Sequence, residues 1–289
     1  MNYLLITLSA VLLALDFAVS KRYQKGAGVE MTASLSFSAA SGLITAAVFF
    51  FIGGCRLNFA PYSIILALMT ALLASAYTLL GFRILRYGNM ALYTLFLMSG
   101  GMITPYVWGV LFFGEPLTVL RTLGVILILI AIVIVNLGKG KPTASQLMLL
   151  AAVFVLNGFV SVLSKYHQIE NTYQTVASAE FVMWSGLFRF VLCVPVIMLA
   201  GMKKNFSEPF PPVKLLGVLA FISALAGGAS YLMQLIAAKS LPATVQYPFV
   251  TGGTIIFSTF AGLIFFREKI TRTQWISIAL CFIGTCLFL

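Results

Sequence analysis

Long apolar stretches alternate with short polar turns along nearly the whole chain. Ten such stretches can be marked, and each comes close to the roughly 20 apolar residues that a helix needs to cross a bilayer. The pattern predicts an all-α membrane protein of ten transmembrane helices. The stretches are Asn2–Ser20, Thr32–Gly53, Pro61–Arg83, Asn89–Phe113, Thr118–Leu137, Ser145–Leu163, Val176–Gly201, Val213–Ala237, Ala243–Phe266 and Thr271–Leu289.

The composition leaves no room for a large soluble domain. The chain of 289 residues is 61% hydrophobic and only 9% charged, whereas about a quarter of the residues of a soluble domain are charged. The formal net charge is +11, but the basic residues stand singly or in pairs at the ends of the apolar stretches. They form no continuous basic face and no nucleic-acid-binding motif. We therefore expect no nucleic acid as a partner. The four cysteines show no metal-binding or redox spacing, and we expect no metal and no cofactor.

The two halves of the sequence resemble each other. Ser20–Leu43 aligns without a gap with Ser164–Leu187, and both contain the pattern A-S-x-x-F-x-x-x-S-G-L. Further along, Gly100–Thr118 aligns with Gly253–Thr271, including the pair Glu115 and Glu268. The sequence therefore predicts a first five-helix repeat over residues 1–138, a linker over 139–144 and a second five-helix repeat over 145–289.

Because five is an odd number, the second repeat enters the membrane in the opposite orientation to the first. Inverted repeats are typical of secondary transporters, which bind the substrate near the middle of the membrane. Two copies of one fold that can exchange conformations give inward-open and outward-open states of similar energy. The repeat therefore predicts a carrier that works by alternating access.

Two loops carry a resemblance to a known family. The motif F-F-G-E-P-L-T at Phe112–Thr118, its copy F-F-R-E-K-I-T at Phe265–Thr271 and the glycine-rich helices before them resemble the drug/metabolite transporter superfamily, and within it the ten-helix EamA-like members. Small multidrug resistance proteins are similar to four of the five helices in each half. The resemblance implies small-molecule transport, but it does not identify the substrate, because the superfamily carries amino acids, sugars, nucleotide sugars and drugs.

The loop charges favour one orientation. Most Lys and Arg residues follow odd-numbered stretches, whereas Arg56, Arg121, Lys165 and Lys239 lie in even-numbered loops. The positive-inside rule then places the odd-numbered loops in the cytoplasm and both termini outside. Ten-helix relatives are generally pictured with both termini inside, so the sequence leaves two orientations open and favours the first.

Arg189 is the strongest candidate for a functional residue. It lies in the middle of an apolar stretch, where a charge costs around 3 kcal/mol on insertion scales, so it is expected to face a cavity or a partner. Ser178 and Ser185 share its face of the helix. Arg189 therefore either binds a carboxylate or phosphate of the substrate or belongs to a buried ion pair or helix clamp.

Asp16 and Glu180 are acids within apolar stretches and are candidates for proton coupling. The alternatives are that Asp16 pairs with the basic loop around Lys21 and that Glu180 is an acid at the membrane interface. The resemblance implies a different place for a proton-exchanging acid, because small multidrug resistance proteins carry theirs eight residues before a matching lysine. That place holds Leu13 here and Asn157 in the second repeat, so Asn157 is expected to offer a neutral donor and acceptor in the cavity.

Tyrosine and glutamine side chains could form the walls of this cavity. They offer stacking and cation–π surfaces together with hydrogen-bonding groups, although each tyrosine alone could equally be an interface anchor or a packing residue. The resemblance matches Tyr247 to a cavity tyrosine of the small multidrug resistance proteins. The predicted substrate-binding residues are Arg189, Asn157, Tyr247, Gln246, Tyr93, Tyr77, Tyr231 and Gln234.

Other motifs have structural explanations. Thr118 and Thr271 are predicted N-caps of the helices that follow them, and Glu115 is predicted to have a structural role in the turn before Thr118. Pro105, Pro195 and Pro248 lie inside predicted helices, where they act as hinges or in static packing.

Taken together, these features predict a secondary-active transporter of a small polar metabolite, an amino acid or another carboxylate-bearing compound, working by export or exchange. The alternative is a carrier of cations, quaternary ammonium compounds or drugs that uses the tyrosines and an acid. An enzyme is not expected, because the single histidine, His167, is predicted in a basic loop and no Ser–His pairing is apparent. We expect a multi-pass plasma-membrane protein whose partners are the lipid bilayer, a small-molecule substrate and protons as a candidate coupling ion.

Overall fold

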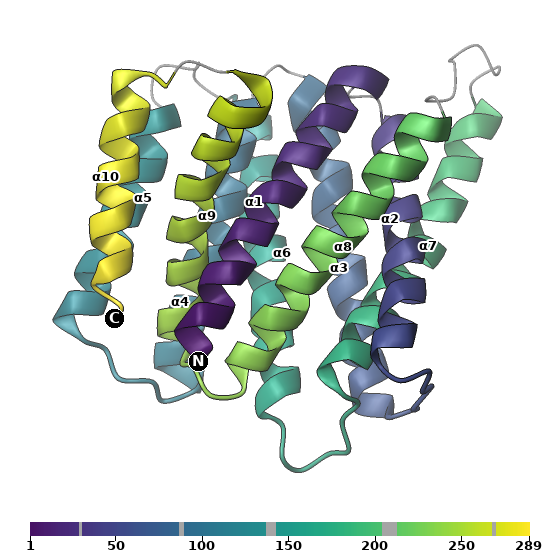
Figure 1. Ribbon diagram of the computed structural model, residues 1–289, viewed down its shortest axis with the longest axis horizontal. Coiled ribbons are helices and arrows are strands. Elements are labelled where there is room, and N and C mark those ends of the chain that lie inside the picture. Colours follow the sequence, from purple (N-terminus) through teal and green to yellow (C-terminus); the bar gives the residue numbers. More distant parts are fainter. Residues whose placement is uncertain (29–30, 87–89, 137–142, 204–212, 268–269) are drawn as a thin grey trace.

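The computed structural model describes residues 1–28, 31–86, 90–136, 143–203, 213–267 and 270–289, and these ranges form ten α-helices and no strand (Figure 1). The helices are α1 (Asn2–Ala27), α2 (Met31–Ile52), α3 (Pro61–Arg86), α4 (Met90–Phe112), α5 (Val119–Asn136), α6 (Ala144–Ile169), α7 (Ser178–Lys203), α8 (Val213–Ala238), α9 (Ala243–Phe266) and α10 (Arg272–Cys286).

Eight of these helices are long and apolar enough to cross a membrane, and α5 contributes a shorter apolar segment, Val119–Ile134. The helices run side by side in one bundle, and both termini lie on the same face of it (Figure 1). The prediction of an all-α membrane protein with ten helices is confirmed.

The predicted N-caps are confirmed. Thr271 accepts a hydrogen bond from the backbone N–H of Gln274 at the start of α10, and the Gln274 side chain accepts one in return from the backbone N–H of Thr271. At the start of α5, Thr118 accepts from the backbone N–H of Arg121. Each cap pairs an amide that would otherwise be left without a partner in the first turn of its helix.

The predicted ends of two helices are wrong. Helix α1 continues to Ala27 and α6 to Ile169, so Lys165 and His167 lie in a helix and not in a loop. The apolar pattern stops at the first basic residues, but their charges find partners at these helix ends. The Nζ of Lys25 lies 4.5 Å from the centroid of the Phe266 ring, and Lys165 is buried against two backbone carbonyls.

The main contacts between the two halves follow a reciprocal pattern. Helix α1 packs against α8 and α9, and α6 packs in the same way against α3 and α4. The pairs α2–α7, α5–α10 and α4–α9 join helices that hold the same place in each half. This is the packing expected of a duplicated unit. The predicted linker, residues 139–144, lies largely outside the described residues, so the division between the repeats stays a prediction.

The two halves come into backbone contact at a pair of aligned glycines in α2 and α7. A Cβ atom on Gly42 of α2 would lie 2.8 Å from the carbonyl oxygen of Gly186 of α7, and a Cβ on Gly186 would lie 2.8 Å from the oxygen of Gly42. Only residues without side chains allow two helix backbones to touch in this way. The α2–α7 contact therefore depends on both glycines.

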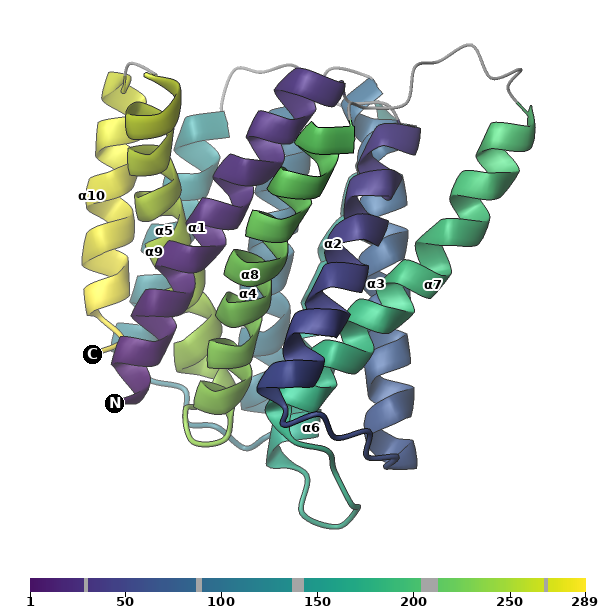
Figure 2. The same ribbon diagram turned by 45° about the vertical axis from the view of Figure 1, so that its right-hand side comes forward.

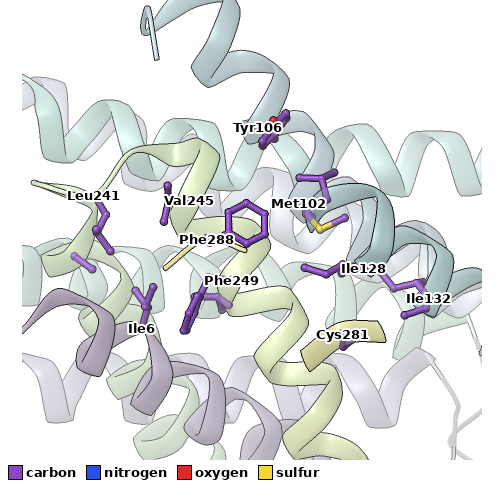
Figure 3. Close-up of a cluster of buried hydrophobic side chains, with 14 residues drawn as sticks. Ile6, Met102, Tyr106, Ile128, Ile132, Leu241, Val245, Phe249, Cys281 and Phe288 are labelled. Carbon is purple, nitrogen blue, oxygen red and sulfur yellow. The ribbon is translucent and has the colours of Figure 1, made fainter. Parts of the chain in front are cut away.

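One side of the bundle, around α5 and α10, is filled by apolar side chains. Figure 3 shows Ile6 of α1, Met102 of α4, Ile128 of α5, Phe249 of α9 and Cys281 of α10 meeting in one cluster. Helices α5 and α10 thus pack into this core, and none of their described residues contributes to the lining of the cavity that lies between the two halves. The other eight helices are left to surround the centre of the molecule.

Candidate functional site

A cavity of about 360 Å³ lies between the two halves and is lined by residues of α1–α4 and α6–α9. This volume is at the lower end of the range for small-molecule sites. The lining residues come from the middle parts of long apolar helices, for example Ala71 and Tyr77 of α3 and Thr251 and Thr254 of α9. A ligand in this cavity would therefore lie well inside the membrane-spanning part of the bundle.

Most of the predicted site residues line this one cavity. It brings together side chains from six helices, α1, α3 and α6–α9. They are Asp16, Tyr77, Asn157, Arg189, Tyr231, Gln234, Gln246 and Tyr247. Tyr93 and Glu180 are not among the residues that line it.

Asp16 and Arg189 form the charged part of the cavity. The Ser223 hydroxyl of α8 donates a hydrogen bond to Oδ1 of Asp16, and the Asp16 carboxylate interacts electrostatically with the Arg189 guanidinium. The Tyr77 hydroxyl lies in the field of both charges. The Nε of Arg189 is buried and has no hydrogen-bond partner in the described part of the chain. Arg189 therefore lies within electrostatic range of an acid, and its Nε has no hydrogen-bond partner among the described residues.

Ser223 was not among the predicted site residues. The antiparallel helices α1 and α8 make two polar contacts with each other. One is the bond from Ser223 to Asp16, and in the other the Oγ atoms of Ser9 and Ser230 lie 3.0 Å apart. The two α8 serines are separated by two turns and face the same way. This spacing is the signal in the sequence that could have identified Ser223.

The other part of the cavity wall is neutral and polar. Four side chains there make hydrogen bonds to another helix. Tyr247 OH donates to the Ser161 carbonyl at 2.7 Å, and Tyr231 OH lies 2.7 Å from Ser164 Oγ. Asn157 Nδ2 donates to the Leu97 carbonyl at 2.7 Å, and Gln246 Nε2 donates to the Gln234 carbonyl at 2.8 Å. Each of these groups thus has a protein partner.

Two further polar atoms at the wall have none. Gln246 Oε1 and Thr45 Oγ1 are buried without a hydrogen-bond partner among the described residues. A buried acceptor or hydroxyl without a partner costs free energy. Together with Arg189 Nε, these atoms are hydrogen-bonding groups that the described part of the protein leaves unpaired.

Glu180 and Tyr93 have local roles away from the cavity. Glu180 is 2% exposed and accepts hydrogen bonds from the backbone N–H of Ala177 at 3.1 Å and from Asn58 Nδ2 at 2.9 Å, so it caps the start of α7. The ring of Tyr93 packs against Gly81 of α3, where a Cβ atom would lie 2.6 Å from it.

Two oppositely charged side chains hold the turn between α8 and α9, next to the cavity residue Gln246. The Nζ of Lys165 donates to the carbonyls of Ala238 at 2.6 Å and Leu241 at 2.7 Å, where α8 ends. Glu115 accepts from the backbone N–H groups of Ala243 at 2.6 Å and Thr244 at 2.7 Å, where α9 begins. Each charge thus meets the helix end of complementary dipole.

The structure contradicts one expectation about His167. A Ser–His pair does exist, because His167 Nε2 lies 2.9 Å from Ser63 Oγ. On its other side, His167 Nδ1 meets the Gln168 amide and not a carboxylate. Ser63 is 0% and His167 is 3% exposed, and neither residue lines the cavity. The pair ties α3 to α6.

These features define a class of protein. A bundle of apolar helices, paired reciprocally between two halves and enclosing a small polar cavity, is the architecture of a multi-pass membrane transporter. The sequence profile of the EamA-like transporter family matches residues 144–289, the C-terminal half of the chain. The protein belongs to this family, within the drug/metabolite transporter superfamily, as the sequence resemblance predicted.

Comparison with solved structures supports the fold. One structure, titled only "Crystal structure of protein", has a TM-score of 0.77 and 17% sequence identity, over 98% of this chain and 95% of that chain. At this identity the likeness shows the fold alone. No curated protein sequence matches the chain.

Proposed function

We propose that this protein is a secondary-active carrier that moves a small carboxylate-bearing metabolite, such as an amino acid, across the plasma membrane by alternating access. The observation that carries the proposal is the state of Arg189. This guanidinium lines the cavity, and its buried Nε has no partner in the described part of the chain.

A carboxylate is the group that best satisfies this arginine. The planar guanidinium offers donors in a fork that matches the two oxygens of a carboxylate. Charge-assisted hydrogen bonds of this kind are about twice as strong as neutral ones. The cavity of about 360 Å³ and its polar neutral wall suit a small metabolite.

The exchange mechanism is supported by the arrangement of the two halves. The cavity lies where helices of both halves meet, and the α2–α7 contact beside it rests on the aligned glycines Gly42 and Gly186. A rocking motion of one half against the other about this contact would expose the cavity first to one side and then to the other.

One observation favours the alternative, a carrier of organic cations. Asp16, Tyr77, Tyr231 and Tyr247 line the same cavity. An acid surrounded by aromatic rings can bind an ammonium group through charge and cation–π interactions. A ligand screen that includes amines therefore separates the two proposals.

The test combines a thermal-shift screen of the purified protein with counterflow in proteoliposomes, using amino acids, organic acids and amines. Binding raises the melting temperature by mass action. We expect a carboxylate compound to bind and to show counterflow, and Arg189→Gln to weaken its binding by about tenfold or more, because a hydrogen bond to a charged group contributes about 1.5–3 kcal/mol.

The control is Arg56→Gln, at an exposed arginine beyond α2, which is expected to leave binding unchanged. Unaltered binding and counterflow in Arg189→Gln would refute the carboxylate proposal. Binding of amines alone, lost in Asp16→Asn, would establish the alternative.

A further inference from the structure

In the described part of the chain, the cavity is lined by two charged side chains, and their charges are opposite. Among the residues that line it, Asp16 and Arg189 are the ones with charged side chains. One is negative and the other positive, so the cavity without substrate carries no net charge when both are ionised.

In the described parts of α8 and α9, which pack against α1, no charged side chain lies in position to neutralise the charge of Asp16. Helix α9 contains no charged residue, and in the described part of α8 the charged side chain is that of Lys214, which is exposed at its start. The groups of α3 and α7 that interact electrostatically with Asp16 are Tyr77 and Arg189. Ionised Asp16 is therefore stabilised by the hydrogen bond from Ser223 and by the positive charge of Arg189.

The carboxylate of Asp16 is held in a cradle formed by α8. Ser223 Oγ donates to Oδ1, and Gly227, one turn further on, leaves the space beside Oδ2, where a Cβ atom would lie 3.0 Å from that oxygen. A serine hydroxyl can donate to a carboxylate or accept from a carboxylic acid. The cradle therefore fits Asp16 both with and without a proton.

A substrate carboxylate changes this balance. If it binds Arg189, the charge of Asp16 loses its partner, and an unpaired charge inside the bundle is strongly unfavourable. Two events can restore neutrality: a proton binds Asp16, or the substrate brings a positive charge of its own.

We propose that the loaded cavity is electroneutral and that Asp16 makes it so: a monocarboxylate is carried with one proton on Asp16, whereas a zwitterionic amino acid is carried with its ammonium group at Asp16 and no proton. The proposal rests on the proposed function. The proton comes from water on the loading side, adds to a carboxylate oxygen of Asp16, and leaves to water on the other side when the substrate anion leaves Arg189. During this time Ser223 Oγ accepts the hydrogen bond that it otherwise donates.

The test counts the protons bound with each ligand, by calorimetry in two buffers of different ionisation enthalpy. The probes are matched pairs that differ by the amino group: propionate with alanine, and hydrocinnamate with phenylalanine. We expect uptake of close to one proton with the acid of a pair and of none with the amino acid. The affinity for the acid is then expected to rise by up to about tenfold for each unit that the pH falls.

Variants assign the proton to its site. In Asp16→Asn, binding of the acid is expected to lose its proton uptake and its dependence on pH, while the amino acid binds more weakly. Glu180→Gln is the control, since it alters a buried acid outside the cavity, and its proton uptake is expected to equal that of the unaltered protein. Equal uptake with both members of a pair, or uptake that persists in Asp16→Asn, would overturn the proposal.

A measurement without ligand separates this proposal from the proposed function. Infrared spectra are recorded at neutral pH for the unaltered protein and for Arg189→Gln, and from each is subtracted the spectrum of the same protein carrying Asp16→Asn. We expect the carboxyl band of a protonated Asp16 in the difference spectrum of Arg189→Gln but not in that of the unaltered protein. If no probe binds but this band appears, the proposed substrate is wrong and the charge balance holds. If the band is absent from Arg189→Gln, the charge balance is wrong, whatever binds.

Discussion

At the scale of single residues, the buried charges differ in how their partners satisfy them. Glu115 and Lys165 are each held by two backbone groups, and Glu180 by one backbone and one side-chain donor. Arg189 differs, because its Nε remains without a partner among the described residues. A buried charge whose hydrogen bonds are all made by the protein stabilises the fold, whereas the unpaired donor of Arg189 is the reason for proposing it as a ligand-binding group.

Lys165→Met tests the stabilising group. The change leaves the carbonyls of Ala238 and Leu241 buried without their donor, and each such group costs about 1–3 kcal/mol. We expect a loss of about 2 kcal/mol or more, measured as a lower melting temperature in detergent. The control is Lys239→Met, at an exposed lysine in the same turn. Equal melting temperatures for the two variants would show that the Lys165 bonds contribute no stability.

The sequence identified the charged residues of the cavity better than their partners. Arg189 and Asp16 are visible because a charge in an apolar stretch is expensive. Ser223 and Lys165 were missed for opposite reasons. A serine is common in membrane helices and carries no cost that would mark it, and Lys165 stands at the end of an apolar stretch, where a lysine is expected to reach water. Only the packing of α6 against the α8–α9 turn shows that Lys165 is buried.

At the scale of elements, hydropathy located all ten helices, and the caps at Thr118 and Thr271 fixed where two of them begin. It failed at the ends of α1 and α6, which continue through basic residues. Hydropathy describes what a side chain prefers in lipid. It does not describe the carbonyls and rings that receive Lys25 and Lys165 beyond the apolar stretch.

Gly42→Ala tests the α2–α7 contact. The added methyl group would lie 2.8 Å from the Gly186 carbonyl oxygen and 3.2 Å from Arg189 Nε, so the helices must move apart. Overpacking of this kind costs about 1–3 kcal/mol, and thermal unfolding is expected to begin at a lower temperature. The matched variant is Gly217→Ala in α8, where nothing lies within 4 Å, so its stability should stay the same or rise slightly. A Gly42→Ala protein as stable as Gly217→Ala would mean that the two helices are not tightly packed.

At the scale of the whole molecule, the sequence repeat predicted the pairing of helices between halves, because two inverted copies of one unit must present equivalent faces to each other. It could not predict the shape of the cavity, which depends on how far eight helices separate at its centre. Figure 2 shows that the helices are not parallel, since the end of α7 leans away from α2 and α3.

A reversible crosslink tests whether the halves move against each other. Asn2 Nδ2 of α1 donates to Ser240 Oγ beyond α8 at 2.8 Å, and this contact joins the two halves on one face of the bundle. In Asn2→Cys/Ser240→Cys, with Cys55 and Cys286 replaced by serine because they are exposed, oxidation is expected to abolish counterflow and a reductant to restore it. The same pair left reduced is the control, and full counterflow in the oxidised protein would argue against rocking at this face.

The two ends of the chain touch. Tyr3 OH donates a hydrogen bond to the Phe288 carbonyl at 2.9 Å, so the first and last helices emerge side by side. The two termini therefore lie on the same side of the membrane, and the orientation of the whole protein follows from which side that is. An epitope on either terminus, found accessible or shielded in sealed vesicles, assigns the compartment of the opposite terminus and of every intervening loop.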